Sequence, residues 1–243
     1  RENSTYVVDS GKSPYNLTAS GAIFNSSGKY GGAYMFNSSS AKLSTNSYSP
    51  LSLFTYTAWV YRTSDPGYDA RIISSESSSA LSSQLYVEAG TNKTICTFAE
   101  SGSPPVNKTV SSNISIQANI WAHVACVRNG TNLIIYINGI NSGSNSSSGS
   151  MQYPGGDSKL YIGNRKGTYT SDRGWNGLID EVRIYGSGLT AANIQQQYYS
   201  NLNRYTTNSW AFFTNQSLTS GSYTYFAFAN DSAGNSNTTE TRI

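Results

Sequence analysis

The sequence has little charge and few of the side chains that enzymes most often use for chemistry. Only 12% of its 243 residues are Asp, Glu, Lys or Arg, and it contains two cysteines, two methionines and one histidine. The formal net charge of +3 is spread along the chain without a Lys/Arg cluster, zinc-finger spacing or helix-turn-helix pattern, so nucleic acid is not an expected partner. No apolar run approaches the ~20 residues that a membrane helix needs, so no membrane span is expected.

The chain is rich in Ser, Thr, Asn, Gly and Tyr, which is typical of an extracellular β protein with polar loops. Its length suffices for one large β domain, or for one such domain and a small module. The first residue is Arg1, from which we expect that a signal peptide or a preceding region has been removed. We therefore predict a secreted or cell-surface protein.

Residues 178–185 show the period-2 pattern of a strand. The pattern places Leu178, Asp180, Val182 and Ile184 on one face, with the intervening residues on the other. A short helix is expected next, capped by Thr190, because Ile194, Tyr198 and Leu202 at intervals of four would form one apolar stripe.

This ending, read as G-L-I-D-E-V-R-I-Y and then a short helix, resembles the laminin-G-like jelly-roll family of the concanavalin A-like lectin/glucanase superfamily. Further blocks resemble the family in its own order, at residues 28–36, 54–61, 121–128, 133–139 and 160–163. The resemblance implies an all-β fold: a two-sheet antiparallel jelly-roll sandwich with one short C-terminal helix, here followed by a small β-strand extension. We place the jelly-roll domain at residues 1–203.

Residues 204–243 form the expected extension, which looks like the closing strands of an immunoglobulin-like or fibronectin-like repeat but is about half of such a domain. Either the chain continues in a longer protein or these strands complete their pairing elsewhere. Unpaired apolar strands associate readily, so we predict that Trp210, Phe212, Tyr223 and Tyr225 contact another copy or another surface protein.

The sequence contains twelve N-x-S/T sequons, which predict N-glycosylation. They lie at Asn3, Asn16, Asn25, Asn37, Asn92, Asn107, Asn113, Asn129, Asn145, Asn215, Asn230 and Asn237. A Ser/Asn-rich chain also forms sequons by accident, and that reading stays open.

Cys96 and Cys126, both in expected strands, are the only cysteines, and in an oxidising compartment they favour one disulfide that closes a 30-residue loop. The alternative is two buried thiols. A zinc site is not expected, because His123 is not spaced with the cysteines as such a site requires.

No catalytic residue is predicted. The glucanases of this architecture use an E-x-D-x-E strand motif, whereas here Leu178 and Val182 flank Asp180 where the two glutamates would stand. Alternation directs Asp180 and Glu181 to opposite faces, so they are not expected to act on one sugar.

The resemblance implies a different role for Asp180, which in related jelly rolls helps to hold a structural calcium. Here the candidate ligands are Asp180, Asp9 and the carbonyls near Gly31 and Gly32. The alternative is that Asp180 accepts backbone hydrogen bonds at a bend. Apart from this possible calcium, no cofactor is expected.

A sugar-binding site needs exposed rings and polar side chains in adjoining loops. The best groupings in the sequence are Tyr153 with Asp157, and Arg165, Tyr169, Asp172 and Arg173 around Trp175. Two functions remain. The first is a non-catalytic, glycosylated structural subunit of a cell surface or filament that assembles through its C-terminal strands. The second is a lectin-like module for carbohydrate binding and adhesion.

Overall fold

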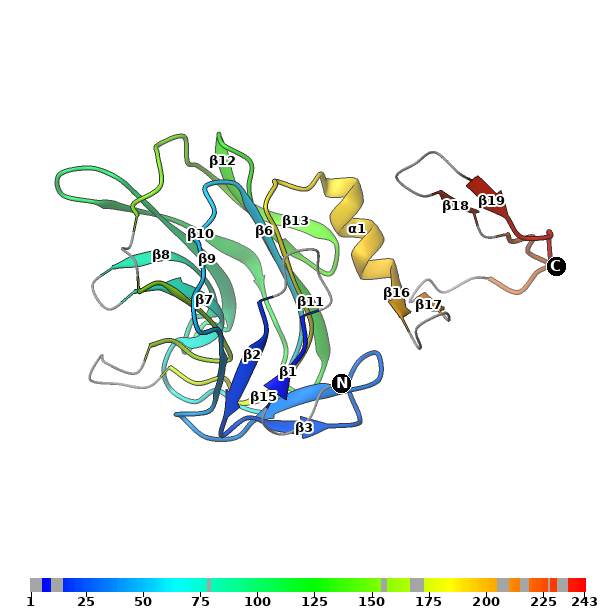
Figure 1. The fold of residues 1–243 in the computed structure, drawn as a ribbon, viewed down its shortest axis with the longest axis horizontal. Helices are drawn as coiled ribbons and strands as arrows, with labels where there is room; N and C mark the ends of the chain where they lie inside the picture. Colours follow the sequence, from blue (N-terminus) through cyan, green and yellow to red (C-terminus); the bar gives the residue numbers. More distant parts are fainter. Residues whose placement is uncertain are drawn as a thin grey trace.

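The protein is a two-layer sandwich of antiparallel sheets with one helix, as seen in the computed structural model (Figure 1). The structure describes residues 6–9, 15–77, 80–153, 157–166, 173–204, 210–214, 219–226, 228–230 and 236–243. The predicted all-β jelly-roll sandwich with one short C-terminal helix is confirmed. No helix in these ranges is long and apolar enough to cross a membrane.

One layer is an eight-stranded sheet with the order β1-β2-β5-β14-β7-β8-β9-β10. Its strands are β1 (Tyr6–Val7), β2 (Leu17–Ser20), β5 (Lys42–Ser44), β14 (Lys159–Ile162), β7 (Ala70–Glu76), β8 (Leu81–Val87), β9 (Lys93–Glu100) and β10 (Val106–Ser115). Strands far apart in the sequence meet here, because β14 lies between β5 and β7.

The other layer is a seven-stranded sheet with the order β13-β12-β11-β6-β15-β4-β3. Its strands are β13 (Ile140–Ser146), β12 (Asn132–Ile137), β11 (Trp121–Arg128), β6 (Phe54–Arg62), β15 (Gly177–Tyr185), β4 (Ala33–Phe36) and β3 (Ile23–Asn25).

The core lies between the two sheets and is built from alternate residues of their strands. Its largest fully buried apolar and aromatic side chains include Phe36, Phe54, Tyr56, Ile72, Leu85, Phe98, Leu133 and Trp175. Cys96 on β9 and Cys126 on β11 form a disulfide that joins the two layers, with 6.0 Å between their Cα atoms. The sequence prediction of one bridge is therefore confirmed.

The alternation expected for residues 178–185 is wrong in its second half. Ile179 is buried in the core, yet Val182 and Ile184 also pack against the core, so the inward face changes from odd to even residues. The change occurs at a bulge, since Asp180 pairs with Trp59 and the next paired residues are Arg183 and Thr57. One extra residue in a bulge reverses the facing of everything that follows.

The helix α1 (Ala191–Tyr199) begins at Thr190 as predicted, with the Thr190 side chain accepting from the Asn193 backbone amide. Ile194 is fully buried and packs with Ala125, Val127 and Tyr136, so α1 covers the outer face of the seven-stranded sheet. The predicted apolar stripe stops at Tyr198. Leu202 lies in strand β16 (Ser200–Arg204), because the helix has ended before it.

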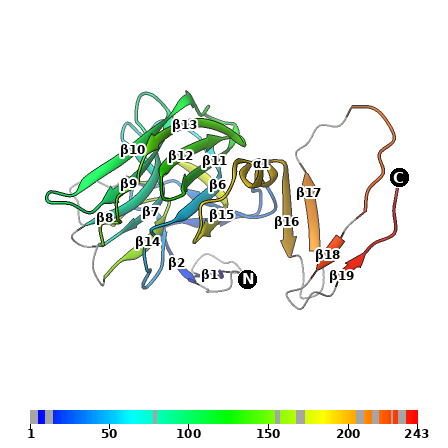
Figure 2. The same ribbon diagram turned by 90° about the horizontal axis from the view of Figure 1, so that it is seen from above.

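The C-terminal residues form two small antiparallel ribbons beyond α1 (Figure 2). Strand β16 pairs with β17 (Trp210–Thr214), and β18 (Phe228–Asn230) pairs with β19 (Ser236–Thr238). The predicted small β-strand extension is therefore present. The boundary at residue 203 and the likeness of this part to an immunoglobulin-like repeat stay predictions.

Candidate functional site

The outer face of the eight-stranded sheet carries polar side chains that are buried although no described helix covers them. We call Arg71, Ser74, Glu76, Gln84, Tyr86 and Thr97, on β7, β8 and β9, the outer polar face. Arg71 and Gln84 retain only 7% and 5% of their accessible surface. Polar groups on an outward sheet face are usually solvated. Their burial here makes this face the candidate functional site.

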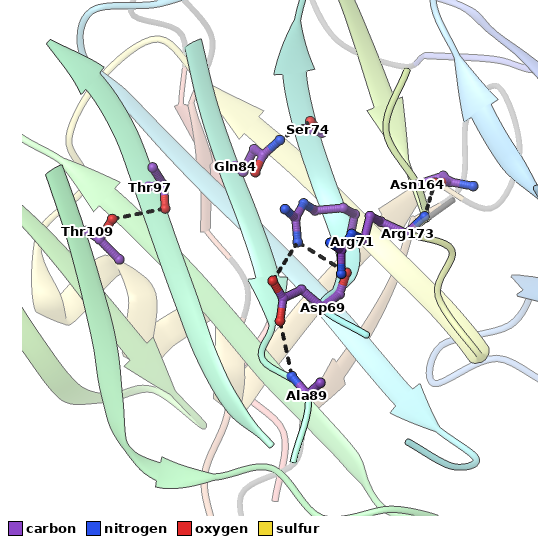
Figure 3. Close-up of polar contacts among 9 residues, drawn as sticks. All are labelled: Asp69, Arg71, Ser74, Gln84, Ala89, Thr97, Thr109, Asn164 and Arg173. Atoms are coloured by element: carbon purple, nitrogen blue, oxygen red, sulfur yellow. Dashed lines mark hydrogen bonds and ion pairs between the residues drawn. The ribbon is translucent and has the colours of Figure 1, made fainter. Parts of the chain in front are cut away.

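Arg71 lies at the centre of this face (Figure 3). Its guanidinium carbon is 4.1 Å from the centroid of the Tyr86 ring, and Nη1 donates to the Asp69 carbonyl at 3.1 Å. The Asp69 carboxylate is 3.9 Å from Nη1 and accepts from the Ala89 amide through its other oxygen. Nε of Arg71 is buried without a hydrogen-bond partner. Arg71 therefore has a buried donor that no described group satisfies.

Asn164 brings two further arginines to the same place. Its Oδ1 accepts from the backbone amides of Arg165 at 2.9 Å and Arg173 at 3.2 Å, and its Nδ2 donates to the carbonyls of Ser39 and Ala41. The Arg71 amide in turn donates to the Arg173 carbonyl at 2.8 Å. Figure 3 shows Arg173 beside Arg71. The buried amide of Asn164 thus sets the position of both arginines.

A chain of hydrogen bonds orders the neighbouring part of the face. Gln84 Nε2 donates to Ser74 Oγ at 3.1 Å, and Ser74 donates to Glu76 Oε1 at 3.1 Å. The same carboxylate oxygen accepts from the Lys166 amide at 2.7 Å. Burial raises the pKa of Glu76. A further pair of hydroxyls, Thr97 on β9 and Thr109 on β10, lies 3.3 Å apart.

This arrangement suits binding better than bond cleavage. Buried amides and hydroxyls can exchange hydrogen bonds with the hydroxyl groups of a sugar, and the half-buried Tyr86 ring offers an apolar surface beside them. Guanidinium groups add donors in a fixed plane. The face is therefore chemically suited to a polar ligand.

Of the residues predicted to bind sugar, Tyr169 and Asp172 lie outside the described part of the chain. Arg165 lies near Arg71, and its positive charge contributes to the lowered pKa of the Arg71 guanidinium. Asp157 pairs with Lys166 at 3.1 Å. Tyr153 is 63% exposed. A role for these residues in binding stays a prediction.

The sequence interpretation missed the residues on β7 and β8, two antiparallel neighbours in which Arg71 pairs with Tyr86 and Ser74 with Gln84. A short signal was present, because Gln84 and Tyr86 alternate with the apolar residues Leu85 and Val87. Large polar side chains at every second position of a strand indicate a face with a use of its own.

Asp180 is buried at the bulge within β15, against the loop that joins β3 to β4. Its Oδ2 accepts from the Tyr30 amide at 3.0 Å and its Oδ1 from the Glu181 amide at 2.7 Å. Burial, partly offset by these bonds, raises its pKa to about 6. These are the backbone hydrogen bonds that the sequence offered as the alternative to calcium binding.

The calcium ligands themselves stay a prediction. Asp9 is bound to its own loop, with Oδ2 accepting from the Tyr15 amide at 2.7 Å. Among the described residues, no group of three or more Asp, Glu, His or Cys gathers as a metal site. Melting curves in calcium and in EDTA would decide the question.

His123 and the neighbouring acidic residues lie beneath α1, on the opposite layer from the outer polar face. A cavity with room for about one water, of roughly 10 Å³, is lined by Thr57, Trp59, His123, Glu181, Arg183 and Gln197. Glu181 pairs with Arg183 at 2.7 Å, and its backbone has a φ of 49° at the bulge. Asp180 instead faces the Tyr30 amide, so the two acids do not converge on one cavity.

The sequon asparagines whose side chains the structure describes are exposed or half-buried, which leaves them accessible to modification. These are Asn16, Asn25, Asn37, Asn92, Asn107, Asn113, Asn129, Asn145 and Asn237. Asn3 and Asn215 lie outside the described residues, and only the backbone of Asn230 is described. The side-chain amide of Asn145, the nitrogen that a glycan would modify, donates to the Thr109 carbonyl at 2.8 Å.

The predicted assembly residues lie in the C-terminal ribbons. Tyr223 and Tyr225 are 41% and 60% exposed, and the neighbouring Phe226 is 63% exposed. Tyr225 forms a backbone bridge with Arg242. Trp210 and Phe212 are in β17, of which the backbone alone is described. Contact with another molecule stays a prediction.

The comparisons with known proteins agree with the fold. Residues 31–195 match the family model described as the concanavalin A-like lectin/glucanases superfamily. No curated protein matches the sequence.

Solved structures of similar fold include domain 4 of an extracellular arabinanase from Geobacillus stearothermophilus, in complex with arabinotriose. It is 18% identical with a TM-score of 0.55, over 72% of this chain and 80% of that one. The sialidase CBM40 from Ruminococcus gnavus, bound to α2,3-sialyllactose, is 13% identical with a TM-score of 0.53, over 61% and 84%. The binding domain of botulinum neurotoxin serotype G is 18% identical with a TM-score of 0.57, and the match covers 81% of this chain and half of that one.

Proposed function

The chain belongs to the concanavalin A-like lectin/glucanase superfamily, and from that membership we propose that it is a non-catalytic carbohydrate-binding module of an extracellular or cell-surface protein. The glycan binds on the outer polar face. The observation that carries the proposal is the set of buried polar side chains on this face, centred on Arg71 and Gln84, in a layer that no described helix covers.

The similar structures support this proposal by their ligands. One was solved with arabinotriose and another with α2,3-sialyllactose, and both are similar to this chain in fold. Because fold alone does not assign function, the weight rests on the side chains of this protein. Sequons do not occur on β7, β8 or β14, although Asn107 and Asn113 lie on the edge strand β10, next to β9.

A glycan array with the full chain tests the proposal, followed by calorimetry with the best ligand. Gln84→Leu removes one amide from the face, and we expect at least a tenfold loss of affinity, since an unpaired sugar hydroxyl costs roughly 1–3 kcal/mol. Gln197→Leu is the matched control, because Gln197 is on α1 and bonds to Thr57 on the other layer. Absence of glycan binding by the wild-type chain, or equal losses in both variants, would contradict the proposed site.

A structural role is the second candidate, favoured by the exposed rings of Tyr223, Tyr225 and Phe226 in the extension. In this role the protein is a glycosylated subunit of a cell surface or filament, and its extension contacts further copies or other surface proteins. Electron microscopy and light scattering would compare the full chain with one that ends at Asn203. Ordered assemblies of the full chain alone support the role, and single particles in both cases contradict it.

A further inference from the structure

The outer polar face gathers positive charge around Arg71. Burial lowers the pKa of Arg71 to about 10, against the opposing effects of Tyr86 and Asp69, and the positive charges of Arg165 and Arg173 add to this lowering. Like charges are brought together here by Asn164 and by the backbone bond between Arg71 and Arg173. Clustered guanidinium groups repel one another, and a bound anion would offset that repulsion through charge-assisted hydrogen bonds.

In the described part of the chain, the carboxylate nearest to Arg71 does not meet its guanidinium at hydrogen-bonding distance. Asp69 comes no nearer to Arg71 than 3.9 Å, which is longer than the 2.7–2.9 Å of a charge-assisted hydrogen bond. Glu76 accepts from the Lys166 amide and from Ser74 through one oxygen. Among the described residues, Arg173 forms no ion pair, and its Nε is buried without a hydrogen-bond partner, as is that of Arg71.

We propose that the outer polar face selects acidic sugars, whose carboxylate is bound by Arg71 and Arg173 while the sugar hydroxyls meet Gln84. The proposal rests on the carbohydrate-binding function proposed above and names the class of its ligand. Tyr86 fixes the plane of the Arg71 guanidinium by stacking on it at 4.1 Å. A planar fork of donors matches a planar carboxylate through two parallel hydrogen bonds, which favours a uronic or sialic acid over a sulfate ester.

The test uses the full chain and pairs of probes that differ in one group. Trigalacturonic acid is compared with its methyl ester, and α2,3-sialyllactose with lactose, by calorimetry at low and high salt. A sulfated galactose oligosaccharide provides the third probe. The variants are Arg173→Gln and Arg71→Lys, the second of which keeps the charge but loses the fork. Arg183→Gln is the control, because Arg183 is a partly buried arginine of the other layer. Circular dichroism melting confirms that each variant folds.

We expect at least one acidic probe to bind tenfold or more tightly than its neutral partner, with weaker binding at high salt. Arg173→Gln and Arg71→Lys should each remove most of that preference, and Arg183→Gln should leave it within twofold. Equal binding of acidic and neutral partners, or binding of the sulfated probe alone, would overturn this inference and leave the carbohydrate-binding function standing. Binding of no glycan at all would overturn both.

Discussion

Arg71 and Tyr86 are cross-strand partners on β7 and β8, and the Arg71 guanidinium stacks on the Tyr86 ring at 4.1 Å from its centroid. Such a stack contributes about 0.5–2 kcal/mol and fixes the plane of the guanidinium. The pair therefore combines an apolar ring with oriented donors at one point of the outer polar face.

Replacement of Tyr86 should affect ligand binding more than folding. Tyr86→Leu removes the ring, so we expect a three- to thirtyfold loss of affinity for the best glycan, together with a drop of about 1 kcal/mol in the free energy of unfolding. Tyr86→Phe keeps the ring and should bind within about threefold of wild type. Calorimetry and urea unfolding measure the two effects. If Tyr86→Phe binds as poorly as Tyr86→Leu, the hydroxyl rather than the ring matters.

Asn164 should be important for both stability and binding. Its 1% exposed side chain serves two carbonyls and two amides, at Ser39, Ala41, Arg165 and Arg173. Asn164→Ala leaves these groups unpaired, so we expect a loss of about 2–4 kcal/mol in the free energy of unfolding and weaker glycan binding. Asn176→Ala is a suitable control, because Asn176 makes exposed side-chain bonds to Thr63 and Ser64. Unchanged binding in a folded Asn164→Ala protein would show that the two arginines are held by other contacts.

Local sequence patterns predicted those features that depend on neighbouring residues. Thr190 caps the helix because a side-chain oxygen at that position meets the first free amides, and the Cys96–Cys126 bridge follows from the count and the strand positions. The facing of Val182 and Ile184 was not predictable, because the bulge at Glu181 is defined only by pairing with β6.

The candidate site could not be predicted from the sequence, because it too depends on how distant strands pair. Arg71 and Arg173 are about one hundred residues apart, and they meet only because the segment around Asn164 crosses the end of β7. Arg165 and Arg173 were among the residues chosen from the sequence, but Arg71 and Gln84 were not. Alternation shows that a strand has a polar face, whereas sheet order determines which polar faces adjoin.

Removal of the disulfide should destabilise the sandwich without changing its fold. Cys96 and Cys126 join the two layers across a separation of 30 residues, and closing a loop of that length limits the unfolded chain. We expect Cys96→Ala/Cys126→Ala to lose about 3–4 kcal/mol in the free energy of unfolding, as measured by guanidinium denaturation. A reduced wild-type sample should behave like the double variant, and reduction of the double variant should change nothing. A loss below 1 kcal/mol would contradict the expected contribution.

Gly177 should tolerate no side chain at the start of β15. Its φ is 135°, and a Cβ there would lie 2.0 Å from the Tyr61 carbonyl oxygen on β6. Gly177→Ala must therefore separate two central strands, and we expect a loss of more than 3 kcal/mol or failure to fold. Gly67→Ala is the matched control, because Gly67 also has a positive φ of 79° but its Cβ would meet nothing within 4 Å. The control should lose only about 1 kcal/mol. Equal losses in the two variants would show that backbone strain, not the clash, determines the cost.

His123 should make the protein less stable in acid. It is 2% exposed on β11, between Trp59 and Tyr198 of α1, and burial followed by the charge of Arg183 lowers its pKa to about 3. Because the folded pKa lies below the unfolded value of 6.5, the stability contribution is complete above pH 6.5. It is lost at up to about 1.4 kcal/mol per unit as the pH falls toward 3. We expect the wild type to lose about 2–3 kcal/mol from this residue between pH 6.5 and 4.5.

His123→Phe keeps a ring in the site but does not titrate. Urea denaturation at each pH measures the unfolding free energy of variant and wild type. The difference between the two isolates the histidine from Glu181 and the other acids. A difference that stays constant across this pH range would show that His123 accepts a proton in the fold as readily as in the unfolded chain.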